Sequence, residues 1–237
     1  MTETITTPGV RNRSRVPAPV LSPLDEHDGP LDRQVYQSLR KAIMSGSLLL
    51  GDRISSRSVG EALGVSQMPV REALKRLEGD GAVQSVAKSG YVIPPMQPDD
   101  YEELLLVRLE LEGLVVRHAA RHIRAEEIRI AQEAHDRLTR ACSWPETLRQ
   151  NFSFHFTIYR AARMPSALAM IENLWLRVGP ALNMIESVPS KADTYIQHVR
   201  ILEGLRRQDP VLVEAALRED IVENAEIVLR QLACSAS

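Results

Sequence analysis

The stretch from Gly64 to Leu77 carries side chains that can read a nucleic-acid duplex. Ser66 precedes a predicted helix and is typical of an N-cap, because its hydroxyl can accept a hydrogen bond from a free backbone N–H of the first turn. Apolar residues recur along this helix at the spacing of a buried face: Val70, Ala73, Leu74 and Leu77. The opposite face presents Gln67, Arg71 and Lys75. A short helix with a polar, basic N-terminal half fits the major groove of DNA.

The elements around this helix predict a winged helix-turn-helix. Apolar spacing predicts three helices, at 31–45, from Ser55 or Ser56 to Leu63, and at 67–78. The second and third are joined by a three-residue turn that contains glycine, as in a helix-turn-helix. Two strands are expected next, at 82–87 and 91–93, with Lys88, Ser89 and Gly90 as the turn between them.

The rest of the chain predicts an antiparallel helical bundle, so the fold class is mainly α. Residues 94–98 contain three prolines and are expected to separate two domains. Beyond them the pattern predicts six helices with short connections, at 99–123, 124–141, 146–163, 165–187, 191–208 and 210–232, the fourth with a kink at Gly179-Pro180. We therefore expect a disordered tail (1–30), a DNA-binding domain (31–96) and an all-helical domain (97–237).

Composition limits the classes of protein that fit. Apolar residues make up 44% of the 237, enough for a large core, while 4% aromatics argue against a protein that stacks single-stranded bases. Residues 31–96 carry nine Lys and Arg against six Asp and Glu, which suits phosphate contact, with ordinary scatter as the alternative. Two cysteines, Cys142 and Cys234, are too few for a disulfide framework or a Cys-based zinc site. Without a signal peptide or a long apolar run, we expect a cytoplasmic protein and no membrane contact.

Several motifs together carry a family resemblance. Residues 31–96 closely resemble GntR-family transcriptional regulators, at Leu39-Arg-Lys-Ala-Ile-Met-Ser-Gly46, the run from Leu63 to Leu77, Gly81 and Lys88-Ser89-Gly90. The helical remainder resembles the FCD ligand-binding domain of the FadR-type subfamily, at Arg108-x-x-Leu111-Glu112, Asn151-x-x-Phe154-His155, Gln197-His198-x-x-Ile201-Leu202 and Ala215-Ala216-Leu217-x-x-Asp220. Six helices in that part are similar to the VanR-type branch.

The resemblance implies which side chains contact the operator. They are Arg57, Ser66, Gln67 and Arg71, with Lys88 and Gly90 at the tip of the wing. Arginine can bind phosphate or guanine and glutamine can read adenine, so the chemistry agrees. Many relatives have Arg-Thr where this chain has Gln67-Met68, so the operator sequence of relatives does not transfer. The alternative for Arg71 is a surface salt bridge with its neighbour Glu72.

The FCD resemblance also implies a divalent metal site. The matching positions are Asn151, His155, His198 and Asp220, where relatives commonly have one Asp and three His. Asn151 and His155 are four residues apart and so share a helix face. Two imidazoles and a carboxylate suit Zn, Ni, Mn or Fe(II), although the neutral Asn and the Asp in place of His should weaken binding. The alternative is a polar pocket without metal.

Arg108 falls within an apolar stripe, and a buried guanidinium requires an anionic partner. The resemblance implies that it binds the carboxylate of a small organic acid, and the alternative is an ion pair with Glu112. His118, His122 and His135 lie on surface-like helix faces and are expected to be solvated.

These expectations describe a homodimeric transcriptional regulator, usually a repressor in this family, that binds a pseudo-palindromic double-stranded operator. A small carboxylate effector would control its affinity for DNA. Two alternatives remain from the residues. One is a metal-dependent enzyme with an appended DNA-binding head, although no general base stands beside the metal set. The other is a regulator whose helical domain only dimerises. We expect no enzymatic activity.

Overall fold

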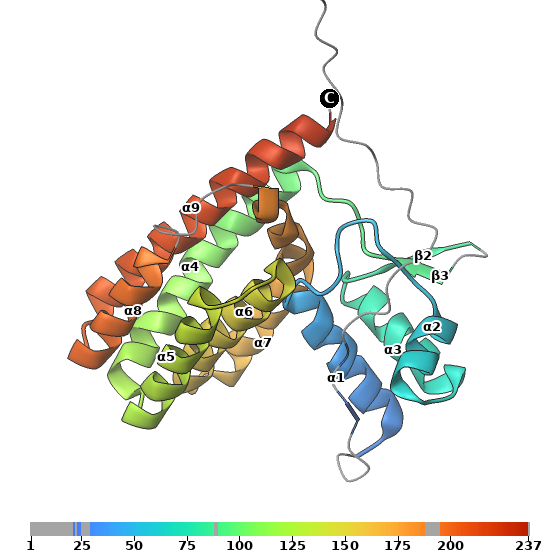
Figure 1. Cartoon of the computed structure of the whole chain (residues 1–237), viewed down its shortest axis with the longest axis horizontal. Coiled ribbons are helices and arrows are strands. Elements are labelled where there is room, and N and C mark those ends of the chain that lie inside the picture. The colour runs from blue at the N-terminus through green and yellow to red at the C-terminus, as the bar shows by residue number, and fades with distance from the viewer. Residues whose placement is uncertain (1–20, 22, 25–28, 88–89, 188–194, 237) are drawn as a thin grey trace, which may run out of the picture.

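The computed structural model describes residues 21, 23–24, 29–87, 90–187 and 195–236. It consists of a helical bundle with a smaller unit beside it, and α1 (Leu31–Met44) of the smaller unit packs against the bundle (Figure 1). The predicted tail at 1–30 lies mostly outside the described residues. Within it, Leu21 and Leu24 are half-buried against the core.

The smaller unit has the predicted winged helix-turn-helix arrangement. After α1 come β1 (Arg53–Ile54), α2 (Ser56–Leu63), α3 (Gln67–Gly79), β2 (Gln84–Val86) and β3 (Gly90–Val92). Both α1 and α2 pack on α3, and the sheet is antiparallel in the order β1-β3-β2. The sequence did not predict β1, because two residues are too few to show an alternating pattern. Of the other two strands, β2 is shorter than the expected 82–87, and β3 has the expected length but begins one residue earlier, at Gly90.

The ends of α2 and α3 follow from a few local contacts. Ser55 is the N-cap of α2 and accepts a hydrogen bond from the backbone N–H of Ser58 at 3.0 Å. Gly64 ends α2 in the left-handed conformation, as its C-cap role predicts. Ser66 occupies the N-cap position of α3, but its side chain makes no capping hydrogen bond, so that part of the prediction is wrong. Its hydroxyl is exposed instead.

The bundle contains the six predicted α-helices and one additional 3-10 helix among the described residues. They are α4 (Pro98–His122), α5 (Ala125–Thr139), α6 (Trp144–Ala161), α7 (Pro165–Ala181), η1 (Leu182–Ser187), α8 (Ile196–Arg207) and α9 (Pro210–Ala236). The predicted helix 165–187 changes to 3-10 geometry after Pro180, which lies inside the last turn of α7. The start of the predicted helix 191–208 lies outside the described residues before Tyr195.

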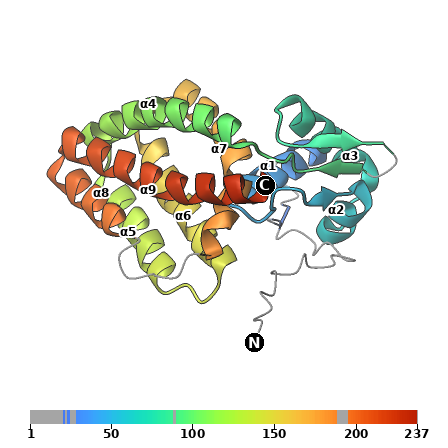
Figure 2. The same ribbon diagram turned by 90° about the horizontal axis from the view of Figure 1, so that it is seen from above.

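The long helices α4 and α9 lie side by side, with α8 against α9 and α5 against α6 (Figure 2). Between them lies an aromatic core that includes Phe154, Phe156 and Trp175. Among the described residues, no helix is both long and apolar enough to cross a membrane.

A buried arginine joins the two units. The side chain of Arg40 on α1 is 7% exposed and donates to Glu172 on α7 at 3.1 Å. It also donates to the hydroxyl of Tyr36 at 2.8 Å, and that hydroxyl donates to Asp80, which caps the C-terminus of α3. Arg40 therefore links α3 to a bundle helix through partly buried charged hydrogen bonds.

Close backbone packing brings α1 and α7 together. A Cβ atom on Gly179 would lie 2.6 Å from the carbonyl oxygens of Ile43 and Met44, so only glycine allows this approach. One turn later, the side-chain amide of Asn183 donates to the carbonyl of Gly46 at 2.8 Å. The end of α7 and the start of η1 are thus fixed directly to the end of α1.

Candidate DNA-reading face and ligand pocket

The predicted DNA-reading side chains lie on one exposed part of the smaller unit. Arg57, Gln67 and Arg71 are all exposed. The Nε atom of Arg57 donates to Glu61 at 2.9 Å, and Ser56 donates to the side-chain oxygen of Gln67 at 3.3 Å. Arg71 forms no salt bridge with any described residue, so the alternative ion pair is not observed.

The wing shows why position 90 must be glycine, while its contact with DNA remains a prediction. Gly90 has a φ of +87°, and a Cβ there would lie 2.6 Å from the carbonyl oxygen of Ile54. Only glycine therefore fits where β3 passes β1. Lys88 lies outside the described residues. Gly90 is exposed at the start of β3, so its backbone remains accessible.

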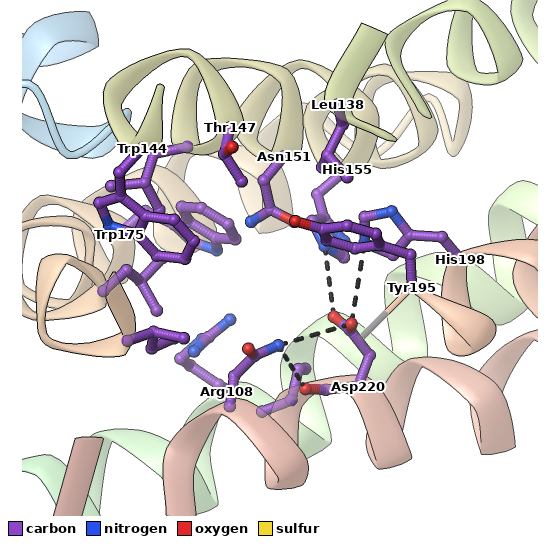
Figure 3. A pocket seen from close by; sticks show the side chains of 15 residues that line it. Arg108, Leu138, Trp144, Thr147, Asn151, His155, Trp175, Tyr195, His198 and Asp220 are labelled. Atoms are coloured by element: carbon purple, nitrogen blue, oxygen red, sulfur yellow. Dashed lines mark hydrogen bonds and ion pairs between the residues drawn. The ribbon is translucent and has the colours of Figure 1, made fainter. Parts of the chain in front are cut away.

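A pocket lies inside the bundle, between α4, α6, α7, α8 and α9. Its cavity measures about 40 Å³, so only a small ligand fits without movement of the walls. Figure 3 shows His155, His198 and Asp220 on one side of it and Trp144 and Trp175 on the other. Apolar side chains complete the lining: Leu138, Leu148, Leu182, Ile185 and Ile221.

Three of the four predicted metal-binding residues converge in this pocket. His155 comes from α6, His198 from α8 and Asp220 from α9, and all three are buried. The Nε2 atom of His155 lies 3.3 Å from Asp220 Oδ2, and Nε2 of His198 lies 3.7 Å from Asp220 Oδ1. Two donors that bind one ion at about 2.1 Å are about 3.0–3.4 Å apart, so these spacings are near those of a metal site.

The protonation of these groups also fits a cation. Burial lowers the pKa of His198 to about 3, against the opposing charge of Asp220, so its imidazole is neutral at physiological pH. Burial alone would raise the pKa of Asp220, but the hydrogen bond with His155 keeps that pKa below its usual value. A neutral imidazole and an ionised carboxylate are the forms that bind metals. The donor set therefore fits a divalent ion.

Asn151, the fourth predicted residue, lines the same pocket and lies beside His155 (Figure 3). Its part as a metal ligand remains a prediction. Asn224 was not predicted; its amide donates to the backbone carbonyl of Asp220 at 2.8 Å and lies 3.5 Å from Asp220 Oδ1. This contact steadies Asp220 on α9.

Arg108 lies on the pocket wall and also forms the ion pair that was the alternative to ligand binding. Its Nε atom donates to Glu112 at 2.7 Å and its Nη2 atom lies 3.4 Å from the other carboxylate oxygen. Burial would lower the pKa of Arg108, but the charge of Glu112 raises it, so the guanidinium stays charged. Glu112 occupies the Nε side of the guanidinium, and Nη1 forms no hydrogen bond with the described residues. The ion pair with Glu112 is therefore observed, and ligand binding by Arg108 remains a prediction.

Two of the histidines expected to be solvated are not. His135 is buried beside His198, with ring centroids 5.7 Å apart, because α5 turns this face toward α8. Its Nδ1 atom and that of His198 have no hydrogen-bond partner among the described residues. His118 is half-buried with its Nδ1 atom 2.8 Å from the carbonyl of Ala162, while His122 is exposed. His27 lies outside the described residues.

Sequence reasoning missed the pocket's aromatic residues. Trp175 lines the pocket but stands at helical spacing among other apolar residues, so its pattern is the same as that of an ordinary core. No signal in the sequence separates a tryptophan that lines a ligand pocket from one that fills a core.

Comparison with known families supports both halves of the resemblance. The family described as "Bacterial regulatory proteins, gntR family" matches residues 31–93, and the FCD domain matches residues 103–223, more than half of the chain. The transcriptional regulator McbR of Escherichia coli is 28% identical over 207 residues, covering 85% of this chain and 94% of McbR. The solved structure of McbR covers 86% of this chain with a TM-score of 0.80.

Other relatives point the same way. A probable repressor of a D-xylose utilization operon from Paenarthrobacter nicotinovorans is 30% identical over 190 residues, covering 79% of this chain and 84% of the repressor. A putative GntR regulator from Rhodococcus, at 20% identity and a TM-score of 0.64, shares the fold. These relatives are transcriptional regulators, which confirms the expectation that the chain is not an enzyme.

Proposed function

Because the chain belongs to the GntR family of bacterial transcriptional regulators and carries an FCD domain, we propose that it is a ligand-responsive repressor. Residues 31–96 would bind the operator and residues 97–237 would bind the effector. The observation that carries the ligand response is the cavity in which Arg108 and the His155, His198 and Asp220 cluster meet. A helical domain that only dimerises would have no need of such buried charged groups.

We assign operator contacts to Arg57, Ser66, Gln67 and Arg71, with Lys88 and Gly90 at the wing. Support comes from the exposure of the four helix residues on one face and from the absence of a salt bridge to Arg71 within the described chain. Arg71 and Gln67 would read base edges, and Arg57 would bind phosphate once it leaves Glu61.

We assign the effector to the pocket as a small carboxylate. The Nη1 side of Arg108 supplies a charged donor, and the cavity volume favours a small acid. His155, His198 and Asp220, with Asn151 nearby, would hold a divalent metal, which would supply positive charge for a second oxygen of the acid. The apolar and aromatic walls would contact the rest of the ligand.

The route from pocket to DNA would run through α7 and η1. Trp175 on α7 and Leu182 on η1 line the pocket, and the same two elements contact α1 through Gly179 and Asn183. A ligand that moves α7 would therefore move α1 and, through Arg40, α3. Couplings of this kind are typically about 1–3 kcal/mol.

A homodimer would use the exposed face of α4. Leu106, Val107 and Leu114 are 67%, 45% and 42% exposed there, at a spacing that keeps them on one side of the helix. A second copy of the chain packed on this face would bury them and place two winged helices for a pseudo-palindromic site. Leu106→Glu should then shift the protein from dimer to monomer in sedimentation experiments, whereas an unchanged dimer would exclude this face.

The ligand response can be tested with the full chain and its operator, selected from random duplexes. Acetate, pyruvate, succinate and benzoate would each be added with Zn²⁺ in a thermal-shift assay, since a true ligand raises the melting temperature. An acid that does so should also change operator affinity about 5–150-fold. If no acid shifts the melting temperature, the assignment of a carboxylate effector is wrong.

The proposed route from the pocket to the DNA-binding unit can be tested separately with Arg40→Gln. The control is Arg33→Gln, on the exposed side of the same helix. The Arg40 variant should lose most of the acid-dependent change in operator affinity, while the Arg33 variant keeps it. Full response in the Arg40 variant would exclude this contact as the link.

A further inference from the structure

The carboxylate of Glu112 on α4 does not line the pocket, but it binds side chains that do. Glu112 is fully buried and accepts hydrogen bonds from three side chains on three helices. Arg108 donates to it at 2.7 Å, the indole of Trp175 at 3.2 Å and the hydroxyl of Tyr159 at 2.5 Å. Each donor has a different place at the pocket. Arg108 faces the proposed acid, Trp175 forms part of the wall, and Tyr159 contacts His155, a proposed metal ligand.

The hydroxyl of Tyr159 has one proton, and the contact with Glu112 uses it. The carboxylate of Glu112 accepts in this contact, so the hydroxyl of Tyr159 is the donor. His155 Nδ1 lies 3.5 Å from the same oxygen. Because Tyr159 has no second proton to give, a hydrogen bond between them must run from the N–H of His155 to the tyrosine oxygen.

This direction of the hydrogen bond decides which nitrogen of His155 is free. If Nδ1 carries the proton of a neutral imidazole, Nε2 carries the lone pair, and Nε2 faces Asp220 at 3.3 Å. The hydrogen bond between His155 and Asp220 in the metal-free site needs a proton on Nε2, and a bound cation would take the place of that proton. A histidine that binds metal commonly donates its other N–H to an acceptor, and Tyr159 is in the place of that acceptor.

We propose that Glu112 and Tyr159 are positioning residues that hold His155 with Nε2 toward the ion, and that the same carboxylate fixes Arg108 for the acid. This inference rests on the proposed function, since it requires a cation between His155, His198 and Asp220. It adds that one buried carboxylate, that of Glu112, holds both Arg108 and, through Tyr159, His155. The metal and the acid would therefore be oriented together.

The chain offers a matched pair of variants to test this. Tyr159→Phe removes the hydroxyl between Glu112 and His155. Tyr101→Phe removes an equally buried hydroxyl that lies on the Arg108 side, away from the proposed metal ligands, and meets no hydrogen-bond geometry with a described residue. Zn²⁺ would be titrated into the metal-free full-length proteins against a competing chelating indicator. We expect Tyr159→Phe to bind Zn²⁺ about 10–100-fold more weakly than the wild type, and Tyr101→Phe to bind it within about twofold.

A wild-type measurement keeps the test decisive if the Tyr159 variant does not fold. In cadmium-loaded protein with nitrogen-labelled histidine, NMR coupling to the metal should appear at Nε2 of His155 and not at Nδ1. Coupling at Nδ1, or equal Zn²⁺ affinity in the two tyrosine variants, would overturn the positioning role alone. If the wild type binds neither ion, the proposed metal itself is wrong and this inference falls with it.

Discussion

Each of the two units of this protein contains an Arg–Glu ion pair four residues apart along a helix. The two pairs differ in what they can do. Arg57 and Glu61 on α2 are joined at 2.9 Å, and their side chains are 79% and 67% exposed. Arg108 and Glu112 on α4 are joined at 2.7 Å, with side chains 6% and 0% exposed. Distance and spacing are nearly the same, and only the surroundings differ.

The difference teaches what each pair can do. In water, an ion pair is weak and exchanges readily, so Arg57 is available for a phosphate. In the bundle, separating Arg108 from Glu112 would leave a charge without solvent, so this pair is a fixed support for a site. We therefore expect the exposed face to bind DNA by releasing its side chains, and the pocket to bind a ligand by holding its side chains in place.

Removing the buried acid should have the largest effect. Glu112→Ala leaves Arg108 charged and unpaired and removes the acceptor of Tyr159 and Trp175. We expect a loss of about 3–5 kcal/mol in the free energy of unfolding, measured by urea denaturation of the full chain. A loss below about 1 kcal/mol would mean that water reaches this site.

A substitution on the exposed face should separate binding from stability. Arg71→Ala should weaken operator binding by about 1–3 kcal/mol, because one base or phosphate contact is lost. The free energy of unfolding should change by less than about 0.5 kcal/mol, since Arg71 has no salt bridge within the described chain. Titration of labelled operator measures the first and urea denaturation the second. Unchanged affinity at several salt concentrations would remove Arg71 from the interface.

The pH dependence of stability should come from the bundle, because residues 31–96 contain no histidine. Burial lowers the pKa of His198 to about 3 and lowers that of His135, whereas an unfolded histidine titrates near 6.5. Below about pH 6.5 the unfolded chain therefore binds more protons than the folded one, and stability falls as the pH falls, by up to about 1.4 kcal/mol per unit for each group.

Unfolding would be followed in metal-free protein between pH 7.5 and 5. His135→Gln should flatten the slope, while His122→Gln, at an exposed position, should leave it unchanged. Equal slopes in the two variants would show that His135 titrates normally in the folded protein.

The smallest effect is expected from Glu61→Ala, the exposed counterpart of Glu112→Ala. Glu61→Ala removes the partner of Arg57 in water, and the free energy of unfolding should change by no more than about 0.5 kcal/mol. The same denaturation series as for Glu112→Ala measures it. A loss of several kcal/mol here would contradict the contrast between the two pairs.

The sequence by itself determined the mainly helical fold, the helix-turn-helix and the exposed helix face that carries Gln67 and Arg71. These rest on local rules: the apolar spacing of α3, the glycine that ends α2, and prolines at element boundaries. It also indicated His155, His198 and Asp220, but only through family resemblance, since 65 residues separate the first from the last. Local patterns contain no information about which distant side chains meet.

Only the tertiary structure decided that Arg108 is paired with Glu112 at the pocket wall, that His135 is buried, and that Tyr159 stands between Glu112 and His155. Each of these depends on which face of one helix meets another across the bundle, and burial changes the energy of a charge or a proton by several kcal/mol. The strand β1 and the contacts of Arg40 were also visible only in the tertiary structure, because both exist only where segments distant in the chain are brought together.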